Sequence, residues 1–268
     1  MQRFCSVKYV KNRTKYVFKY MKNSIIANIT NVIKRLQVNR VFSADIFVTD
    51  TQSRAAVRMA LGRLVAMGKI RKLDRGRYYK PQETILGEMV PSIEDVLSDL
   101  VFDKNHKIIG YLTGTIVFAQ LGLTTQITTQ IQIGVKKYRR SAKRGRYTVT
   151  FVEQPNPIKK KDIELFRLLD ALRFIKDIPA TTPEEAIERM LFLVGRQSEQ
   201  KQKRLVDLAL NYKPYVRALL GAIMEKNQAN EALVTKLRKS LNDSTIFRLH
   251  ISEEIIPAAK WNIKKEKP

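Results

Sequence analysis

The stretch from Thr51 to Lys80, TQSRAAVRMALGRLVAMGKIRKLDRGRYYK, constrains the fold more than any other part of the chain. Its first half predicts an amphipathic helix, because apolar side chains recur at helical spacing on one side. The residues of this apolar face are Val57, Ala60, Leu61, Leu64, Val65 and Met67. Gly68 predicts the end of the helix, since glycine readily adopts the left-handed conformation that follows a helix.

The second half of the stretch predicts a short basic hairpin. Residues 70–73 and 77–80 have strand character and are joined by a loop of Asp74, Arg75 and Gly76. Upstream, Ser43 can cap a short helical segment, and Asn23 or Ser24 can open a longer amphipathic helix. The apolar face of that longer helix is expected to contain Ile25, Ile29, Val32, Ile33 and Leu36. Helix, short helix, second amphipathic helix and basic hairpin follow the order of a winged helix-turn-helix.

The side of the second helix opposite its apolar face carries small residues between arginines, so a DNA major groove could approach the backbone closely. We therefore expect helix and hairpin side chains to bind DNA. The expected DNA-binding residues include Gln52, Arg58, Arg63 and Lys69, together with cations of the basic hairpin. The alternative for such a pattern is a small helical core whose arginines are only solvated.

Charge favours the first interpretation. Residues 1–80 contain 19 Lys and Arg against 3 acidic residues, so 19 − 3 = +16 of the net +25 lies in this part of the chain. Such a domain is expected to bind double-stranded DNA with a strong salt dependence, because neutralising phosphates releases counterions. Residues 1–22 contain seven of these 19 cations and five aromatic residues, and no acid. This arm either packs its aromatics on the helices or lies along phosphates.

Several function classes are disfavoured by composition. The single cysteine excludes an intramolecular disulfide, and no apolar run is long enough for a membrane span, so a cytoplasmic protein is expected. The two histidines, His106 and His250, have no matching ligand motif, and no nucleotide-binding loop or hydrolase motif occurs. We therefore expect no enzyme activity, no metal and no cofactor.

The expected fold class is α+β and predominantly helical, with two domains. A winged helix-turn-helix with its basic arm covers residues 1–85, and residues 81–89 lose periodicity as in a linker. The second domain covers residues 90–268, with a mixed α/β part at 90–155, helices at 158–245 and a tail at 246–268. In the mixed part, Ser92 can cap a helix that runs to Val101, and Thr113 can cap a short helix that Gly122 ends.

Two long strands are predicted next, because residues 127–135 and 147–152 alternate between apolar and polar side chains. We expect them to form a long hairpin whose tip is strongly basic. The tip cations are Lys136, Lys137, Arg139, Arg140, Lys143, Arg144 and Arg146. Such a run is either a solvated loop, a second phosphate contact or a contact with an acidic protein.

Helices are predicted for most of the remaining chain. Residues 163–175 carry one apolar face, and Thr182, Pro183 and Glu185 supply an N-cap, a first-turn proline and a capping-box glutamate for the next helix. Further helices are expected over residues 199–210, 214–226 and 231–241. Phe247 to Ile251 can return as a strand, and Trp261 can anchor the tail.

Several of these segments together resemble a bacterial family. They are VRMALGRL from Val57, GKIRKLDRGRYY from Gly68, GYLTG from Gly110, LGLTTQ from Leu121, NYKPYVRALLGAI from Asn211, LRKSLN from Leu237 and WNI from Trp261. The chain resembles the AbiEi-like antitoxins of abortive-infection toxin–antitoxin systems. The resemblance implies an N-terminal winged helix that represses the operon's own promoter, and a C-terminal region that counters a nucleotidyltransferase toxin without a stable complex. Carried over to this sequence, the resemblance places Arg54, Arg58 and Arg63 on the helix that faces DNA, and it places Arg71, Lys72, Arg75 and Arg77 on the wing. It implies no catalytic residue.

Three other functions stay open on the sequence alone. The second domain could clamp an acidic partner directly through residues 136–146, the basic surfaces could bind RNA, or the chain could be a plain winged-helix regulator unrelated to a toxin.

Overall fold

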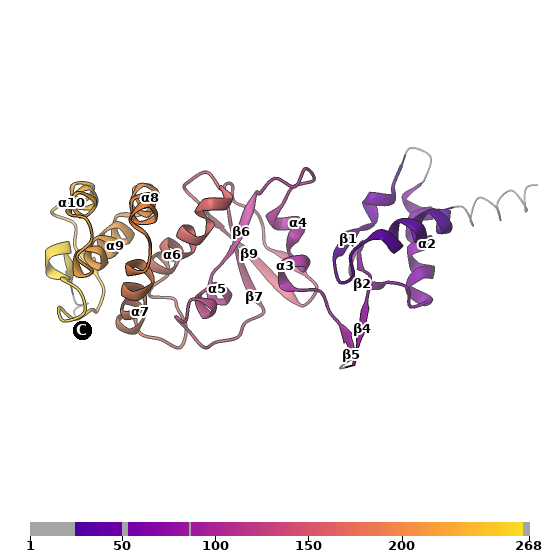
Figure 1. The fold of residues 1–268 in the computed structure, drawn as a ribbon, viewed down its shortest axis with the longest axis horizontal. Coiled ribbons are helices and arrows are strands. Elements are labelled where there is room, and N and C mark those ends of the chain that lie inside the picture. Colours follow the sequence, from indigo (N-terminus) through magenta and orange to yellow (C-terminus); the bar gives the residue numbers. More distant parts are fainter. Residues whose placement is uncertain (1–24, 50–52, 86, 265–268) are drawn as a thin grey trace, which may run out of the picture. The chain divides into compact units, whose positions relative to one another are not determined.

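The computed structural model describes residues 25–49, 53–85 and 87–264. These residues form a mixed α/β structure that divides into two units, residues 1–98 and residues 99–268 (Figure 1). The division lies beyond the boundary expected at residues 85–90. The basic arm at residues 1–22 and the side chain of Gln52 lie outside the described residues.

The first unit begins, within its described part, with a helix over residues 25–35. The elements that follow are β1 (Val41–Ser43), the 3-10 helix η1 (Ala44–Phe47), α2 (Arg54–Ala66), β2 (Arg71–Asp74), β3 (Arg77–Tyr79), β4 (Gln82–Thr84), β5 (Gly87–Met89) and α3 (Ile93–Val96). Strands β1, β3 and β2 form a three-stranded antiparallel sheet in that order. The hairpin expected after α2 is therefore confirmed, and β1 extends it to a sheet.

Local sequence signals explain where α2 begins and ends. The Ser53 hydroxyl accepts a hydrogen bond from the Ala56 N–H, which satisfies one of the free amides of the first turn. At the other end Gly68 has φ +69°, the conformation in which an added Cβ is strained, and it stops the helix as expected.

The first unit has its own apolar core, formed by the helix over residues 25–35, the β1–η1 segment, α2 and the sheet. Its buried members include Ile29, Leu61 and Ile70. Two predicted core residues do not belong to it, because Met67 is 57% exposed and Val32 is 44% exposed. Met67 was wrongly assigned to the apolar face because it is the C-cap residue, where the helical periodicity no longer holds.

The segment expected to be a linker contains structure of its own. Strands β4 and β5 form an antiparallel hairpin, and the Arg71 guanidinium binds the Glu88 carboxylate of β5 at 2.8 Å. Ser92 caps a helix as expected, but that helix ends at Val96 and a second short helix, α4 (Ser98–Val101), follows. The single helix predicted through Val101 is therefore two short ones.

The second unit begins with a four-stranded sheet and continues with helices. Its elements after α4 are β6 (Gly110–Thr113), α5 (Thr115–Gln120), β7 (Gln130–Val135), β8 (Ala142–Arg144), β9 (Tyr147–Glu153), η2 (Lys160–Asp162), α6 (Ile163–Arg173), α7 (Pro183–Gly195), α8 (Glu199–Ala209), α9 (Pro214–Lys226), α10 (Glu231–Lys239), β10 (Phe247–Arg248), η3 (Ala259–Trp261) and β11 (Ile263–Lys264).

The long hairpin predicted for this unit is wrong. Strands β7 and β9 are neighbours, but they run parallel, and the sheet order is β6-β7-β9-β8. The chain leaves β7, crosses to the outer strand β8, and returns through a tight antiparallel turn into β9. Alternating apolar residues predict a strand but do not give its direction, because both directions bury the same face.

Two further expectations for this region are corrected. Thr113 is the last residue of β6 and is buried, while Gly114, with φ +76°, occupies the N-cap position of α5. Strand β7 begins at Gln130, since Ile127 is 96% exposed and lies outside the sheet. Gly122, with φ +72°, ends the helical segment as expected.

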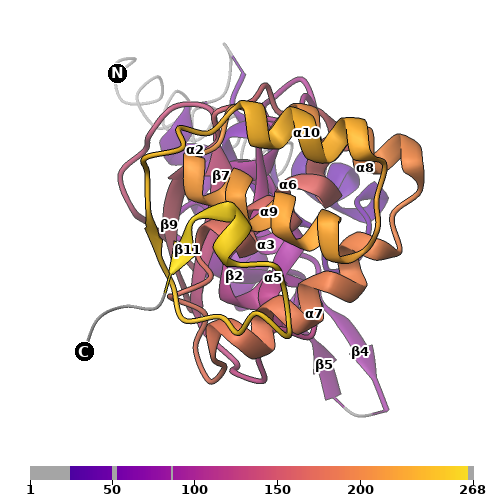
Figure 2. The ribbon, with the colours of Figure 1, turned by 90° about the vertical axis from the view of Figure 1, so that its left-hand side faces the viewer.

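The predicted helices of the C-terminal part are confirmed. At the start of α7 the Thr182 hydroxyl accepts from the Glu185 N–H while the Glu185 carboxylate accepts from the Thr182 N–H, which is the capping box the sequence indicated. Figure 2 shows the yellow C-terminal segment lying against α9. There the Trp261 indole N–H donates to Glu225 at 2.8 Å, and the ring packs against Gly221.

A buried carboxylate joins the sheet to the helices of the second unit. Asp170 of α6 is fully buried and accepts hydrogen bonds from Tyr111 at 2.7 Å, Thr113 at 2.9 Å and Tyr212 at 3.1 Å. The Gln154 amide donates to both tyrosine hydroxyls. Burial raises the pKa of Asp170, while the three hydroxyl donors oppose that rise. Both carboxylate oxygens of Asp170 accept hydrogen bonds and the group is enclosed, so we interpret it as a structural residue that holds the sheet and the helices together.

Candidate nucleic-acid interface

A cationic groove lies between α2 and the β2–β3 hairpin in the first unit. We call it the α2–hairpin groove. It has a volume of about 430 Å³. The lining residues are Ser43, Ala44, Asp45, Val48, Arg54, Val57, Arg58, Lys72, Arg75, Gly76, Arg77 and Tyr78. Two of the expected helix arginines and three of the expected hairpin cations are thus brought together.

Local structure explains how these cations meet. Arg54 and Arg58 are one helical turn apart, so they project from the same side of α2. On the hairpin, Gly76 has φ +77° and allows the tight turn beside Arg75. The pairing register of β2 and β3 shifts between Lys72 and Asp74, next to the groove residue Arg75.

Four of the groove cations are available for an anionic ligand. The charged groups of Arg54, Arg58, Lys72 and Arg75 make no hydrogen bond or ion pair with any residue that the structure describes. Asp45 is the single acidic residue of the groove lining. Its carboxylate accepts a hydrogen bond from the Ser43 hydroxyl at 3.2 Å. The excess of positive charge in a concave surface favours binding of a polyanion.

Two predicted DNA-binding arginines are engaged inside the first unit. Arg77 pairs with Asp74 at 3.3 Å and also donates to the Val96 carbonyl. Its side chain is only 11% exposed. Arg71 pairs with Glu88, as described above. Both arginines hold the hairpin to segments that follow it in the chain. Their partners there, Glu88 and the Val96 carbonyl, lie 17 and 19 residues further along the chain, so local spacing rules do not reveal them.

Two other predicted residues of this group, Arg63 and Lys69, do not line the groove. Arg63 lies on a different flank of α2, where it lines an apolar cavity of about 270 Å³ with Ile25, Ile26 and Met59. Lys69 follows Gly68 and is exposed. Of the expected DNA-binding residues, Arg54, Arg58, Lys72 and Arg75 are the ones that line the groove and have no described partner.

The basic segment at residues 136–146 in the second unit is divided between engaged and exposed cations. Arg144 donates to both carboxylate oxygens of Asp99, from Nε to Oδ1 at 3.3 Å and from Nη2 to Oδ2 at 2.8 Å. Lys136 donates to the Pro155 carbonyl at 2.7 Å. Arg139 lies over the Phe151 ring and Arg146 over the Tyr147 ring. The remaining cations, Lys137, Arg140 and Lys143, are exposed. The segment is therefore anchored to the unit, and three of its exposed cations have charged groups without a hydrogen bond, ion pair or ring contact to any described residue.

No cluster of three or more His, Cys, Asp or Glu side chains within the described ranges has the geometry to hold a metal ion. No helix in that part of the chain has the length and apolar character to cross a membrane.

These features define a basic, mixed α/β protein of two units with a candidate polyanion-binding groove in the first. The chain belongs to DUF6088, a family of unknown function whose model matches residues 28–202. Comparison with curated proteins found no match. Among solved structures, the chain is similar to the RV2827C protein from Mycobacterium tuberculosis, with 14% sequence identity, a TM-score of 0.46 and coverage of 84% of each chain.

Proposed function

We propose that this protein is a DNA-binding transcriptional autorepressor and the antitoxin of a toxin–antitoxin pair. The observation that carries the DNA-binding part is the α2–hairpin groove, in which four cations without a described partner converge from a helix and a hairpin. The antitoxin part rests on the resemblance to AbiEi-like antitoxins, which extends over both units. In this proposal the protein acts by binding, without catalysis or a cofactor.

The first unit is proposed to be a winged helix-turn-helix. In support, the order of its elements and the antiparallel β1-β3-β2 sheet are those that place one helix and one hairpin on the same side of a small core. In that arrangement α2 is the recognition helix and the β2–β3 hairpin is the wing. A major groove about 12 Å wide admits such a helix.

The roles of the groove cations follow from their positions. Arg54 and Arg58, on α2, are proposed to contact base edges, and Lys72 and Arg75, on the hairpin, to contact backbone phosphates. Arg71 and Arg77 support the wing through their ion pairs rather than through DNA. The exposed cations Lys137, Arg140 and Lys143 are proposed as a second, weaker phosphate contact.

The test of the DNA-binding part is titration of the full chain with a duplex from its own promoter, followed by fluorescence anisotropy. Arg58→Ala is expected to weaken promoter binding by about 1–3 kcal/mol and to reduce the preference over unrelated duplex. The matched control is Arg35→Ala, because Arg35 is exposed on the helix over residues 25–35 and does not line the groove. Equal weakening by both variants would contradict the assigned surface.

Competition with a structured RNA separates DNA from RNA as the ligand. We expect promoter duplex to displace bound RNA at a much lower concentration than the concentration of RNA needed to displace bound promoter duplex. Equal displacement in both directions would favour the RNA-binding alternative.

The antitoxin part needs a separate experiment. Co-expression with a nucleotidyltransferase toxin encoded beside it is expected to restore growth, and Arg58→Ala is expected to retain this rescue while losing repression. Failure of the wild-type chain to rescue, with promoter binding intact, would leave a plain regulator. Rescue that is lost when Lys137, Arg140 and Lys143 are neutralised, together with co-purification, would favour direct clamping of the toxin.

A further inference from the structure

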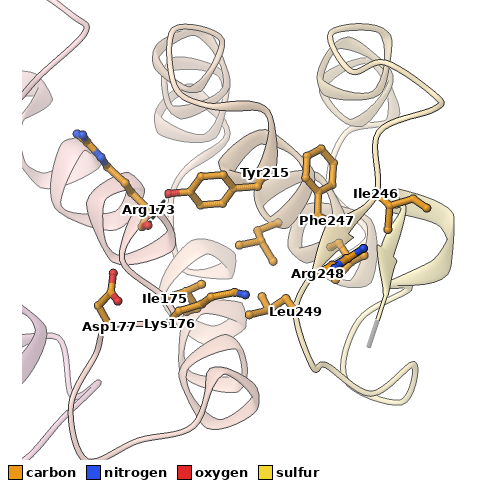
Figure 3. Close-up of a pocket in the computed structure, with 11 residues that line it drawn as sticks. Arg173, Ile175, Lys176, Asp177, Tyr215, Ile246, Phe247, Arg248 and Leu249 are labelled. Atoms are coloured by element: carbon orange, nitrogen blue, oxygen red, sulfur yellow. Dashed lines mark hydrogen bonds between the residues drawn. The ribbon is translucent and has the colours of Figure 1, made fainter. Parts of the chain in front are cut away.

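An apolar pocket in the second unit lies between the end of α6, the start of α9 and β10 (Figure 3). We call it the α6–α9–β10 pocket. Its volume is about 410 Å³. The apolar side chains of its wall are Ile175, Tyr215, Leu219, Phe247, Leu249 and Ile263. Ile246 beside it is 53% exposed. A cavity of this size and character accepts one large apolar side chain.

One wall of this pocket is a strand with an unpaired edge. The N–H groups of Phe247 and Leu249 donate to Asn262 and Lys264 of the C-terminal segment. Because backbone groups alternate along a strand, the N–H and C=O of Arg248 point to the opposite edge. Figure 3 shows β10 between the yellow C-terminal strand and the pocket. Within the described residues β10 pairs with β11 alone, so that edge can accept another strand.

The charges beside the pocket are mostly positive. Arg173, Lys176 and Arg248 line it against one acidic residue, Asp177. Arg173 is turned toward the Glu153 carbonyl, to which it donates at 2.8 Å. The Arg248 guanidinium is exposed and makes no hydrogen bond or ion pair with any described residue. Figure 3 shows Lys176 approaching from the segment after α6 and Arg248 from β10.

We propose that the α6–α9–β10 pocket binds an extended acidic peptide segment of a partner protein, which adds as a strand to β10. One large apolar side chain of the peptide fills the pocket, and a neighbouring Asp or Glu pairs with Arg248. Strand addition gives affinity through the backbone, and the pocket and the charge give specificity. A second copy of this chain is a poor occupant, because its net charge of +25 would meet a basic rim.

This inference does not depend on DNA binding, and its test leaves the first unit unchanged. The full chain is used to select from a phage-displayed library of short random peptides, and enriched peptides are titrated by fluorescence anisotropy. We expect enriched peptides to combine a large apolar residue with a neighbouring acid. Arg248→Glu is expected to weaken them by about tenfold or more.

Two further variants separate the contributions. Arg248→Ala removes the charge and keeps the outward N–H, whereas Arg248→Pro removes both, so the proline variant is expected to bind more weakly than the alanine variant. The matched charge control is Lys203→Glu, because Lys203 is exposed on α8 and does not line the pocket. This variant is expected to retain affinity. The proposal is overturned if no peptide is enriched, if enriched peptides lack acids, or if Lys203→Glu weakens them as much as Arg248→Glu.

Discussion

Replacing Arg75 by alanine tests the proposed wing contact through the salt dependence of DNA binding. Each phosphate that a cation neutralises contributes about 0.9 to the slope of log affinity against log salt. If Lys72 and Arg75, the two cations proposed to contact phosphates, each neutralise one phosphate, they contribute about 1.8 to that slope. Arg75 is exposed at the hairpin loop and has no partner among the described residues, so its loss should leave the fold intact.

The expected result is a slope flatter by about 0.9, for promoter duplex and for unrelated duplex alike. Between about 50 and 200 mM salt, this difference means that the variant loses about 3.5-fold less affinity than the wild type loses. Anisotropy titrations at several salt concentrations measure it directly. Arg35→Ala is the matched control and should keep the wild-type slope.

The reasoning is refuted if Arg75→Ala keeps the wild-type slope while Arg35→Ala flattens it. It is also refuted if Arg75→Ala changes promoter binding and leaves unrelated duplex unaffected, because a phosphate contact carries no base preference.

Three further predictions concern stability, each measured by denaturation of the full chain. Gly221→Ala should destabilise the second unit by about 1–3 kcal/mol or more, because the added Cβ would overlap the Trp261 ring; unchanged stability would show that the ring is not held there. Thr182→Ala should cost about 1 kcal/mol by removing the capping box of α7, and a loss near zero would contradict that role. The hydrogen bond from Arg204 holds the pKa of Asp162 below its usual range. The ion pair between them therefore stabilises the folded chain fully above the pKa that Asp162 has in the unfolded chain, about 4, and this stabilisation is lost as pH falls through the lower pKa of the folded chain. The stability difference between wild type and Asp162→Asn should therefore shrink on acidification, and a constant difference would contradict the pairing.

The parts of the fold that the sequence predicts are those fixed by neighbouring residues. The capping box at Thr182 and Glu185 and the stop at Gly68 each depend on a few adjacent positions, so spacing rules suffice to find them. The direction of β9 relative to β7 depends on where the intervening chain crosses, and residues 136–146 carry no signal for that path.

The candidate site was predictable to the same extent. Arg54, Arg58, Lys72 and Arg75 follow from a helix and a hairpin that are both local in sequence. Arg77 is a hairpin arginine like Arg75, so the sequence does not distinguish the two. Arg77 nevertheless donates to the Val96 carbonyl, which lies beyond the β4–β5 hairpin in the chain. The α6–α9–β10 pocket could not be predicted, since its walls come from three segments far apart in the chain.

The buried carboxylate of Asp170 has a consequence for cutting the second unit into pieces. A fragment that stops before α6 would keep the hydroxyls of Tyr111 and Thr113 without their acceptor, and a fragment that starts at α6 would keep the acceptor with one of its three donors. Each piece alone would have a polar side chain at an apolar surface without its hydrogen-bond partner, which raises the free energy of the isolated piece. The two pieces should therefore recombine when mixed, which makes the chain between Pro155 and Pro157 a natural place for a split reporter of partner binding.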